Sequence, residues 1–96
     1  MFILRIVHPV HDFNAWKRAF DSDPVGRKNS GVRRYKIFRP VDNENFVMID
    51  LEFDTRSQAE DTLAALREVW NKVEGKIISK PQTWIVQSVE SADIQS

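Results

Sequence analysis

Hydrophobic residues recur along the chain with two different periods, and these periods predict four strands and two helices. Short runs rich in Ile, Val, Phe and Tyr are typical of strands, whereas apolar residues three and four apart indicate amphipathic helices. The predicted strands cover residues 2–7, 32–39, 46–53 and 83–90. The predicted helices follow Asp12 and Thr55 and end near Ser22 and Gly75. The order is therefore strand, helix, strand, strand, helix, strand.

Both helices begin at side chains that accept hydrogen bonds from the first turn. Asp12 is a good N-cap residue, and three aromatic residues follow it at helical spacing. Thr55 and Gln58 match a capping box, in which each side chain satisfies the backbone N–H of the other residue. The predicted apolar faces comprise Phe13, Trp16 and Phe20 in the first helix and Ala59, Leu63, Leu66, Trp70 and Val73 in the second.

The connection between the second and third predicted strands is short, which implies a hairpin. Centring its turn on residues 42–44 creates two cross-strand pairs of opposite charge on one face of the sheet. A slip of one residue would mix charged and apolar side chains on both faces, so this register is strongly preferred. The charged face pairs Arg34 with Glu52, Lys36 with Asp50 and Phe38 with Met48, and the apolar face comprises Tyr35, Ile37, Val47, Ile49, Leu51 and Phe53.

Right-handed crossovers place both helices on one face of a four-stranded antiparallel sheet. The sequence thus predicts an α+β, ferredoxin-like βαββαβ fold, with one domain over residues 1–90 and a frayed tail over residues 91–96. The other face of the sheet also carries apolar residues. The simplest way to bury them is against the same face of a second copy of the chain. We therefore expect a homodimer through this sheet face; the alternative is scattered surface hydrophobes, which are normal. The apolar residues expected on this outer face are Val32, Phe38, Phe46 and Met48, together with one side of the first strand.

Composition limits the classes of protein that fit this pattern. The 96 residues leave room for one core, and the lack of Cys excludes a disulfide framework, a thiolate zinc site and a cysteine nucleophile. The net charge is zero, although residues 1–40 carry +6 and residues 41–96 carry −6. This balance gives no argument for nucleic acid or an anionic membrane. We find no secretory signal and no membrane span, so cytoplasm is the default location.

Residues 7–21 read Val-His-Pro-Val-His-Asp-Phe-Asn-Ala-Trp-Lys-Arg-Ala-Phe-Asp, a strand end followed by a helix rich in aromatic residues. The segment resembles small bacterial proteins of the dimeric α/β-barrel superfamily, especially the antibiotic-biosynthesis-monooxygenase-like members. Arg27, Gly31 with Val32, and Phe53 with Asp54 also sit where such sequences often place similar residues. The resemblance implies a dimeric α/β barrel, a fold that hosts oxygenation, isomerisation, haem degradation and non-catalytic roles.

The resemblance implies a small-molecule-binding protein, with cofactor-independent monooxygenation of an aromatic or polyketide-like substrate as the leading function. In that chemistry a base deprotonates an electron-rich aromatic substrate, whose carbanion then reacts with oxygen. The alternative is a non-catalytic ligand-binding or stress-responsive homodimer. The sequence leaves open whether the chain is an enzyme at all. If it is one, it could resemble a cyclase or isomerase instead of a monooxygenase. Haem-degrading relatives carry an Asn on the first strand and a His after a Trp on the second helix. This chain has Trp70 in place of that Trp, but it has no Asn on the first strand and no His after residue 11. No haem or other cofactor is therefore expected.

Two histidines and three large aromatic residues are the candidate site residues. His8 or His11 could act as a general base near pH 7, although both also suit a polar turn. Strand and helix phase place Tyr35 on the helix side of the sheet, facing Trp16 and Trp70, which could shape a cleft for a flat substrate or simply pack the core. A cavity on the order of several hundred Å³ with a His at its wall would favour an enzyme. No metal site is expected, because the chain has no third His and no Cys.

Six basic residues lie between positions 27 and 39, with Tyr35 and Phe38 interleaved among them, as in a nucleic-acid-binding patch. Strand alternation distributes these charges over both faces, and two of them already have acidic partners, so nucleic acid is not an expected partner. Arg33 and Arg39 have no obvious partner and could clamp an anionic ligand or lie solvated at an edge strand. The expected partners are a second copy of the chain and a small aromatic ligand, without nucleic acid or membrane.

Overall fold

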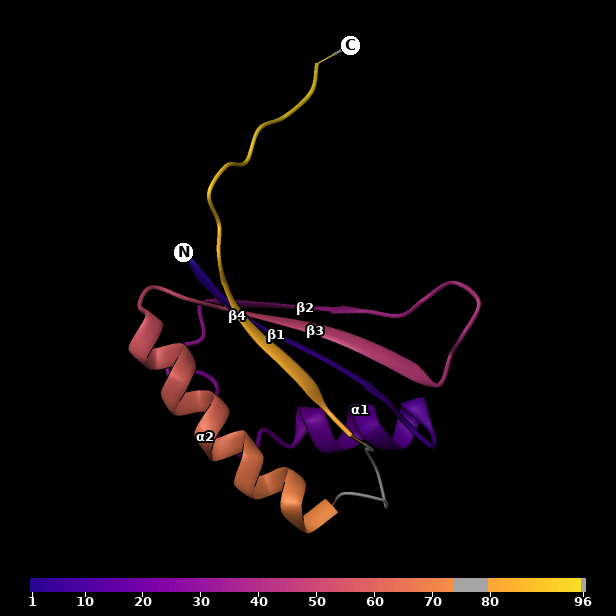
Figure 1. Ribbon diagram of the computed structural model, residues 1–96. Helices are drawn as coiled ribbons and strands as arrows, with labels where there is room; N and C mark the ends of the chain where they lie inside the picture. Colours follow the sequence, from indigo (N-terminus) through magenta and orange to yellow (C-terminus); the bar gives the residue numbers. More distant parts are fainter. Residues whose placement is uncertain (74–79, 96) are drawn as a thin grey trace.

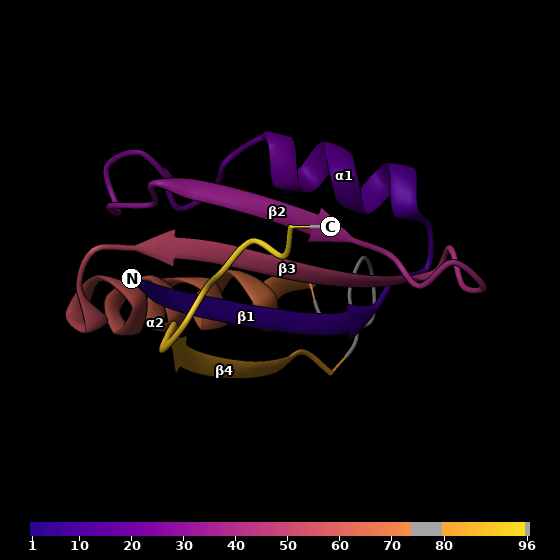
Figure 2. The same cartoon turned by 90° about the horizontal axis from the view of Figure 1, so that it is seen from above.

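One antiparallel sheet with two helices on one of its faces makes up the fold (Figure 1). The computed structural model describes residues 1–73 and 80–95. Its elements are β1 (Phe2–Pro9), α1 (Phe13–Asp21), β2 (Arg34–Phe38), β3 (Phe46–Phe53), α2 (Arg56–Val73) and β4 (Gln82–Gln87). The strands lie in the order β2-β3-β1-β4, with α1 toward the β2 edge and α2 behind β3 and β1 (Figure 2). The predicted ferredoxin-like α+β fold is confirmed.

Most element boundaries agree with the predicted ones. β3 is as predicted, and β4 ends at Gln87, short of the predicted residue 90. β1 is longer than predicted, because His8 and Pro9 continue the pairing with β3. The predicted end of the second helix at Gly75 lies outside the described residues.

The start of β2 differs from the prediction for a physical reason. The backbone N–H of Val32 donates to the carbonyl of Arg27 over 3.0 Å, so Val32 belongs to the preceding loop. Its side chain packs against the core rather than on the outer face of the sheet. Gly31 precedes it with φ +93°, beside the Gln58 side chain, where a Cβ would come within 2.6 Å of Nε2. Only glycine combines this backbone angle with this close approach.

The predicted helix caps are both confirmed. The Asp12 carboxylate accepts from the backbone N–H of Asn14 at 2.9 Å and of Ala15 at 3.4 Å. Thr55 Oγ1 accepts from the backbone N–H of Gln58, and Gln58 Oε1 accepts from that of Thr55, both over 3.2 Å. These bonds satisfy backbone donors that a helix start otherwise leaves without a partner.

The predicted hairpin register is confirmed, but the partner of Asp50 is not the expected one. Lys36 lies opposite Asp50 in the β2–β3 pair, and Arg5 lies opposite it in the β1–β3 pair. Among the described residues it is Arg5 that holds the carboxylate, with Nε at 2.8 Å from Oδ1 and Nη2 at 3.0 Å from Oδ2. A guanidinium matches a carboxylate with two parallel bonds, which an ammonium cannot do.

Strand alternation separates the core from the outer face of the sheet. The helix side of β1 and β3 is buried, and Trp16 of α1 and Ala59 of α2 pack against it. The outer face keeps apolar side chains in contact with solvent, with Phe38 45% and Trp84 50% exposed. Residues 88–95 form no helix or strand and extend away from the sheet on this outer side (Figure 1).

Removing the α2 cap should cost measurable stability. We expect Thr55→Ala to lower the free energy of unfolding by about 1 kcal/mol, because one backbone N–H loses its acceptor. Urea denaturation followed by circular dichroism measures the change. Arg67→Ala, at an exposed position further along α2 and away from the cap, is the control and should stay within about 0.5 kcal/mol of the wild type. Equal losses in the two variants would contradict a specific role for the cap.

Candidate functional site

An apolar cavity of about 110 Å³ lies between the sheet and the two helices. Sheet residues make its floor, and aromatic residues of α1 and the C-terminal half of α2 make its sides. This volume is well below the several hundred Å³ expected to favour an enzyme, and is on the order of a cavity that holds one benzene ring. The principal apolar lining residues are Ile6, Ile49, Trp16, Phe20, Leu66 and Trp70. We call this space the aromatic cleft.

His8 brings a polar group to the wall of the aromatic cleft. It follows Leu4 and Ile6 on the helix side of β1 and is only 2% exposed. Its ring meets Trp16 edge-on, with the ring centroids 6.0 Å apart. His8 Nδ1 lies 2.9 Å from the carbonyl oxygen of Pro9. Because a carbonyl can only accept, this contact keeps the proton on Nδ1 and leaves the lone pair on Nε2.

The environment of His8 favours the neutral imidazole. Burial lowers the pKa of His8 from its ordinary value of 6.5, and the hydrogen bond to the Pro9 carbonyl offsets this only in part. The side chain is therefore uncharged at pH 7. A neutral imidazole with a free lone pair can accept a proton or a hydrogen bond from a bound molecule.

Three of the five predicted site residues line the aromatic cleft, namely His8, Trp16 and Trp70. Tyr35 lies outside it, 43% exposed, with its ring 5.1 Å from that of Phe20. His11 is exposed in the turn before α1 and does not line the cleft. The turn interpretation therefore fits His11 and is wrong for His8, which lies within β1. Catalytic or binding roles for all five stay predictions.

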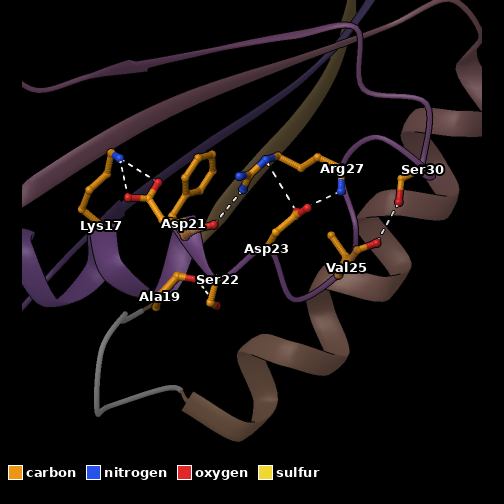
Figure 3. A network of polar contacts seen from close by, with 9 residues as sticks. Lys17, Ala19, Asp21, Ser22, Asp23, Val25, Arg27 and Ser30 are labelled. Atoms are coloured by element: carbon orange, nitrogen blue, oxygen red, sulfur yellow. Dashed lines mark hydrogen bonds and ion pairs between the residues drawn. The ribbon is translucent and has the colours of Figure 1, made fainter.

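The sequence did not reveal that Arg27 would line the cleft. Its guanidinium carbon lies 4.1 Å from the centroid of the Phe20 ring and 5.1 Å from that of Tyr35. Nη1 donates to the Phe20 carbonyl over 2.8 Å, and Nε lies 3.6 Å from Oδ1 of Asp23 (Figure 3). The i,i+4 spacing of Asp23 and Arg27 is the only sequence signal for this arrangement.

Arg33 and Arg39 both have partners, contrary to expectation. Arg33 Nε lies 3.4 Å from a carboxylate oxygen of Asp54. The guanidinium of Arg39 stacks over the Phe13 ring at 4.3 Å from its centroid. Both sites are outside the aromatic cleft.

Residues 1–73 and 80–95 hold no group of three or more His, Asp or Glu side chains that could bind a metal ion. Neither described helix is long and apolar enough to cross a membrane.

Known proteins resemble this chain in fold but not in sequence. No protein-family model and no curated protein matches its sequence. SnoaB, a cofactor-independent oxygenase from Streptomyces nogalater, has a TM-score of 0.68 at 11% identity over 94% of each chain. A dimeric ferredoxin-like protein from an uncultured marine organism has a TM-score of 0.65 at 15% identity, over 95% of this chain and 97% of that one. An antibiotic biosynthesis monooxygenase has a TM-score of 0.69 at 9% identity, over 94% of this chain and 100% of that one.

The chain is therefore similar in fold to antibiotic-biosynthesis-monooxygenase-like proteins, as the sequence resemblance predicted, and also to a dimeric ferredoxin-like protein. At identities of 9–15% this likeness establishes the fold alone.

Lowering the pH should destabilise the protein through His8. The unfolded chain gains a proton on His8 as the pH falls through about 6.5, whereas the folded chain does so only at lower pH, so stability is lost between the two values. We expect the free energy of unfolding in urea to fall from about pH 7.5 to about pH 5.5, and to fall less in His8→Asn. His11→Asn, which removes the exposed imidazole, is the matched control. An unaltered pH dependence in the His8 variant would contradict the assignment.

Proposed function

We propose that this chain binds a small, flat aromatic molecule in the aromatic cleft and oxidises it with dioxygen, without a cofactor. One observation carries the proposal: a buried, neutral imidazole with its lone pair on Nε2 forms part of an apolar wall that contains two tryptophans. The fold likeness to a cofactor-independent oxygenase supports it.

His8 is the proposed base. Its Nε2 takes a proton from an acidic CH₂ group of a phenolic aromatic substrate, and the resulting carbanion is delocalised over the ring. Dioxygen is the oxidant: it accepts electrons from the carbanion and forms a C–O bond. The O–O bond and the second C–H bond then break, and the distal oxygen leaves as water with that second proton, so that CH₂ and O₂ become C=O and H₂O. The departing oxygen takes up the proton held by His8, which returns the imidazole to its neutral form.

Trp16 and Trp70 are the proposed binding residues. They lie on the two helices that flank the cleft, and their large faces suit a flat ring. With about 110 Å³ available, one ring fits inside and further rings of a larger substrate extend toward solvent.

A non-catalytic ligand-binding homodimer is the second candidate function. The small volume of the cleft favours it, since pockets that enclose a whole substrate measure roughly 300–1,000 Å³. In that case His8 accepts a hydrogen bond from the ligand, and no proton leaves carbon.

In either function we propose a homodimer that covers the outer face of the sheet. Phe38 and Trp84 are half-exposed there, near the ion pair that the half-exposed Arg5 makes with the buried Asp50. A second copy would bury this apolar area, and a dimeric ferredoxin-like protein shares the fold.

Oxygen consumption tests the proposed base. With anthrone, which has an acidic CH₂ between two aromatic rings, we expect the wild type to consume oxygen faster than the uncatalysed reaction. His8→Ala should reduce the rate about 10²- to 10⁴-fold, because proton removal loses its acceptor. His11→Ala is the matched control and should keep wild-type turnover. Full activity in the His8 variant would overturn the proposed role, and binding without turnover in the wild type would favour the second candidate.

Sedimentation tests the dimer. We expect the wild type to sediment as a dimer at a concentration of about 10 μM and Trp84→Glu to sediment as a monomer, because the new carboxylate would lose its water in the interface. Val41→Glu, at a 98% exposed position in the hairpin turn, is the control and should remain dimeric. A monomeric wild type would refute the proposed interface.

A further inference from the structure

An open bowl of about 470 Å³ adjoins the aromatic cleft. Asp23 and Arg27 line both spaces, so the two are contiguous at these side chains. The cleft is almost wholly apolar, whereas the bowl is rich in positive charge. Its basic lining residues are Arg27, Lys28, Arg33 and Arg34.

The basic residues of the bowl differ in how their charges are balanced. Arg33 and Arg34 are held by Asp54 at 3.4 Å and by Glu52 at 3.7 Å, neither of which lines the bowl. Within residues 1–73 and 80–95, no carboxylate lies within 4 Å of the Lys28 ammonium. The remaining cation is Arg27, the only one that also lines the cleft. Its Nε lies 3.6 Å from Oδ1 of Asp23, so one edge of the guanidinium already has a carboxylate partner.

Arg27 is held in a geometry that suits recognition of an anion. Its guanidinium stacks on Phe20 and approaches Tyr35, and its side chain is 19% exposed. Contacts to the face of a guanidinium leave its N–H groups free to bond in the plane at its edge. Among the described residues, one N–H of Nη1 bonds to the Phe20 carbonyl and Nε lies near Asp23, so the three other N–H groups of the five have no hydrogen-bond acceptor there.

We propose that the cleft and the bowl are two parts of one site, which takes an aromatic acid. The ring lies in the aromatic cleft, and a carboxylate or phenolate group lies at the edge of Arg27, with Lys28 as a second cation. This inference rests on the proposed function, because the ring occupies the same cleft. It adds that the ligand carries negative charge, and it makes Arg27 the residue that selects it.

A matched pair of probes tests the inference, namely 2-naphthoate and its neutral isostere 2-naphthamide. Titration into ¹⁵N-labelled protein, followed by two-dimensional NMR, gives both the affinities and the residues affected. We expect the carboxylate to bind about tenfold more tightly, as a hydrogen bond to a charged group warrants. Arg27→Gln should remove this preference and Arg27→Lys should keep most of it. Arg39→Gln, which removes a guanidinium stacked on Phe13 away from both spaces, is the matched control.

The outcomes separate this inference from the proposed function. Equal binding of both probes at cleft residues, or equal effects of the Arg27→Gln and Arg39→Gln variants, would overturn the selection of an acid and leave the aromatic cleft intact. No shifts at cleft residues with either probe would overturn the cleft itself and the inference with it. A salt titration of the wild type tests the same point without relying on a variant that folds. Between about 50 and about 500 mM NaCl, binding of 2-naphthoate should weaken and binding of 2-naphthamide should not. Equal salt dependence would also overturn the selection.

Discussion

The antiparallel pairing of β1 with β3 positions both the core and the candidate site. In its register Leu4, Ile6 and His8 follow one another on the helix side of the sheet. Because strand side chains alternate, a slip of one residue would turn all three to the other face. On that other face the bidentate pair of Arg5 with Asp50 forms only in the observed register. The row of side chains that builds the core therefore ends in an imidazole at the wall of the cleft.

The end of α1 and the loop that follows it close the cleft from the other side. The chain reverses after the helix through Asp23 at φ +56° and Gly26 at φ +65°. Arg27 then returns to the helix and donates to the carbonyl of Phe20. This turn brings an apolar wall and a cation to neighbouring positions. A ligand with an apolar ring and a charged group could use both without any rearrangement of the loop.

Local patterns were sufficient to predict the fold, whereas the site depended on contacts between distant segments. The charge pattern of the hairpin gave its register, but it could not show that Arg5 would displace Lys36 as the partner of Asp50, because that contact comes from a third strand. The prediction ended β1 at Val7, although continued alternation would have put His8 on the same face as Leu4 and Ile6. For Arg27 the sequence offered only the family resemblance and the i,i+4 spacing from Asp23. Its place at the cleft could not be predicted, since that place depends on the path of a loop between two elements.

The proposed catalysis in the cleft depends on the protonation state of one imidazole, and NMR of the ring nitrogens of His8 measures that state directly. At pH 7 the Nδ1 contact with the Pro9 carbonyl requires a pyrrole-type resonance for Nδ1 and a pyridine-type resonance for Nε2. Binding of an aromatic ligand in the cleft should shift the Nε2 resonance. A proton on Nε2 in place of Nδ1, or a charged ring at pH 7, would contradict the assignment of His8 as the base of this site.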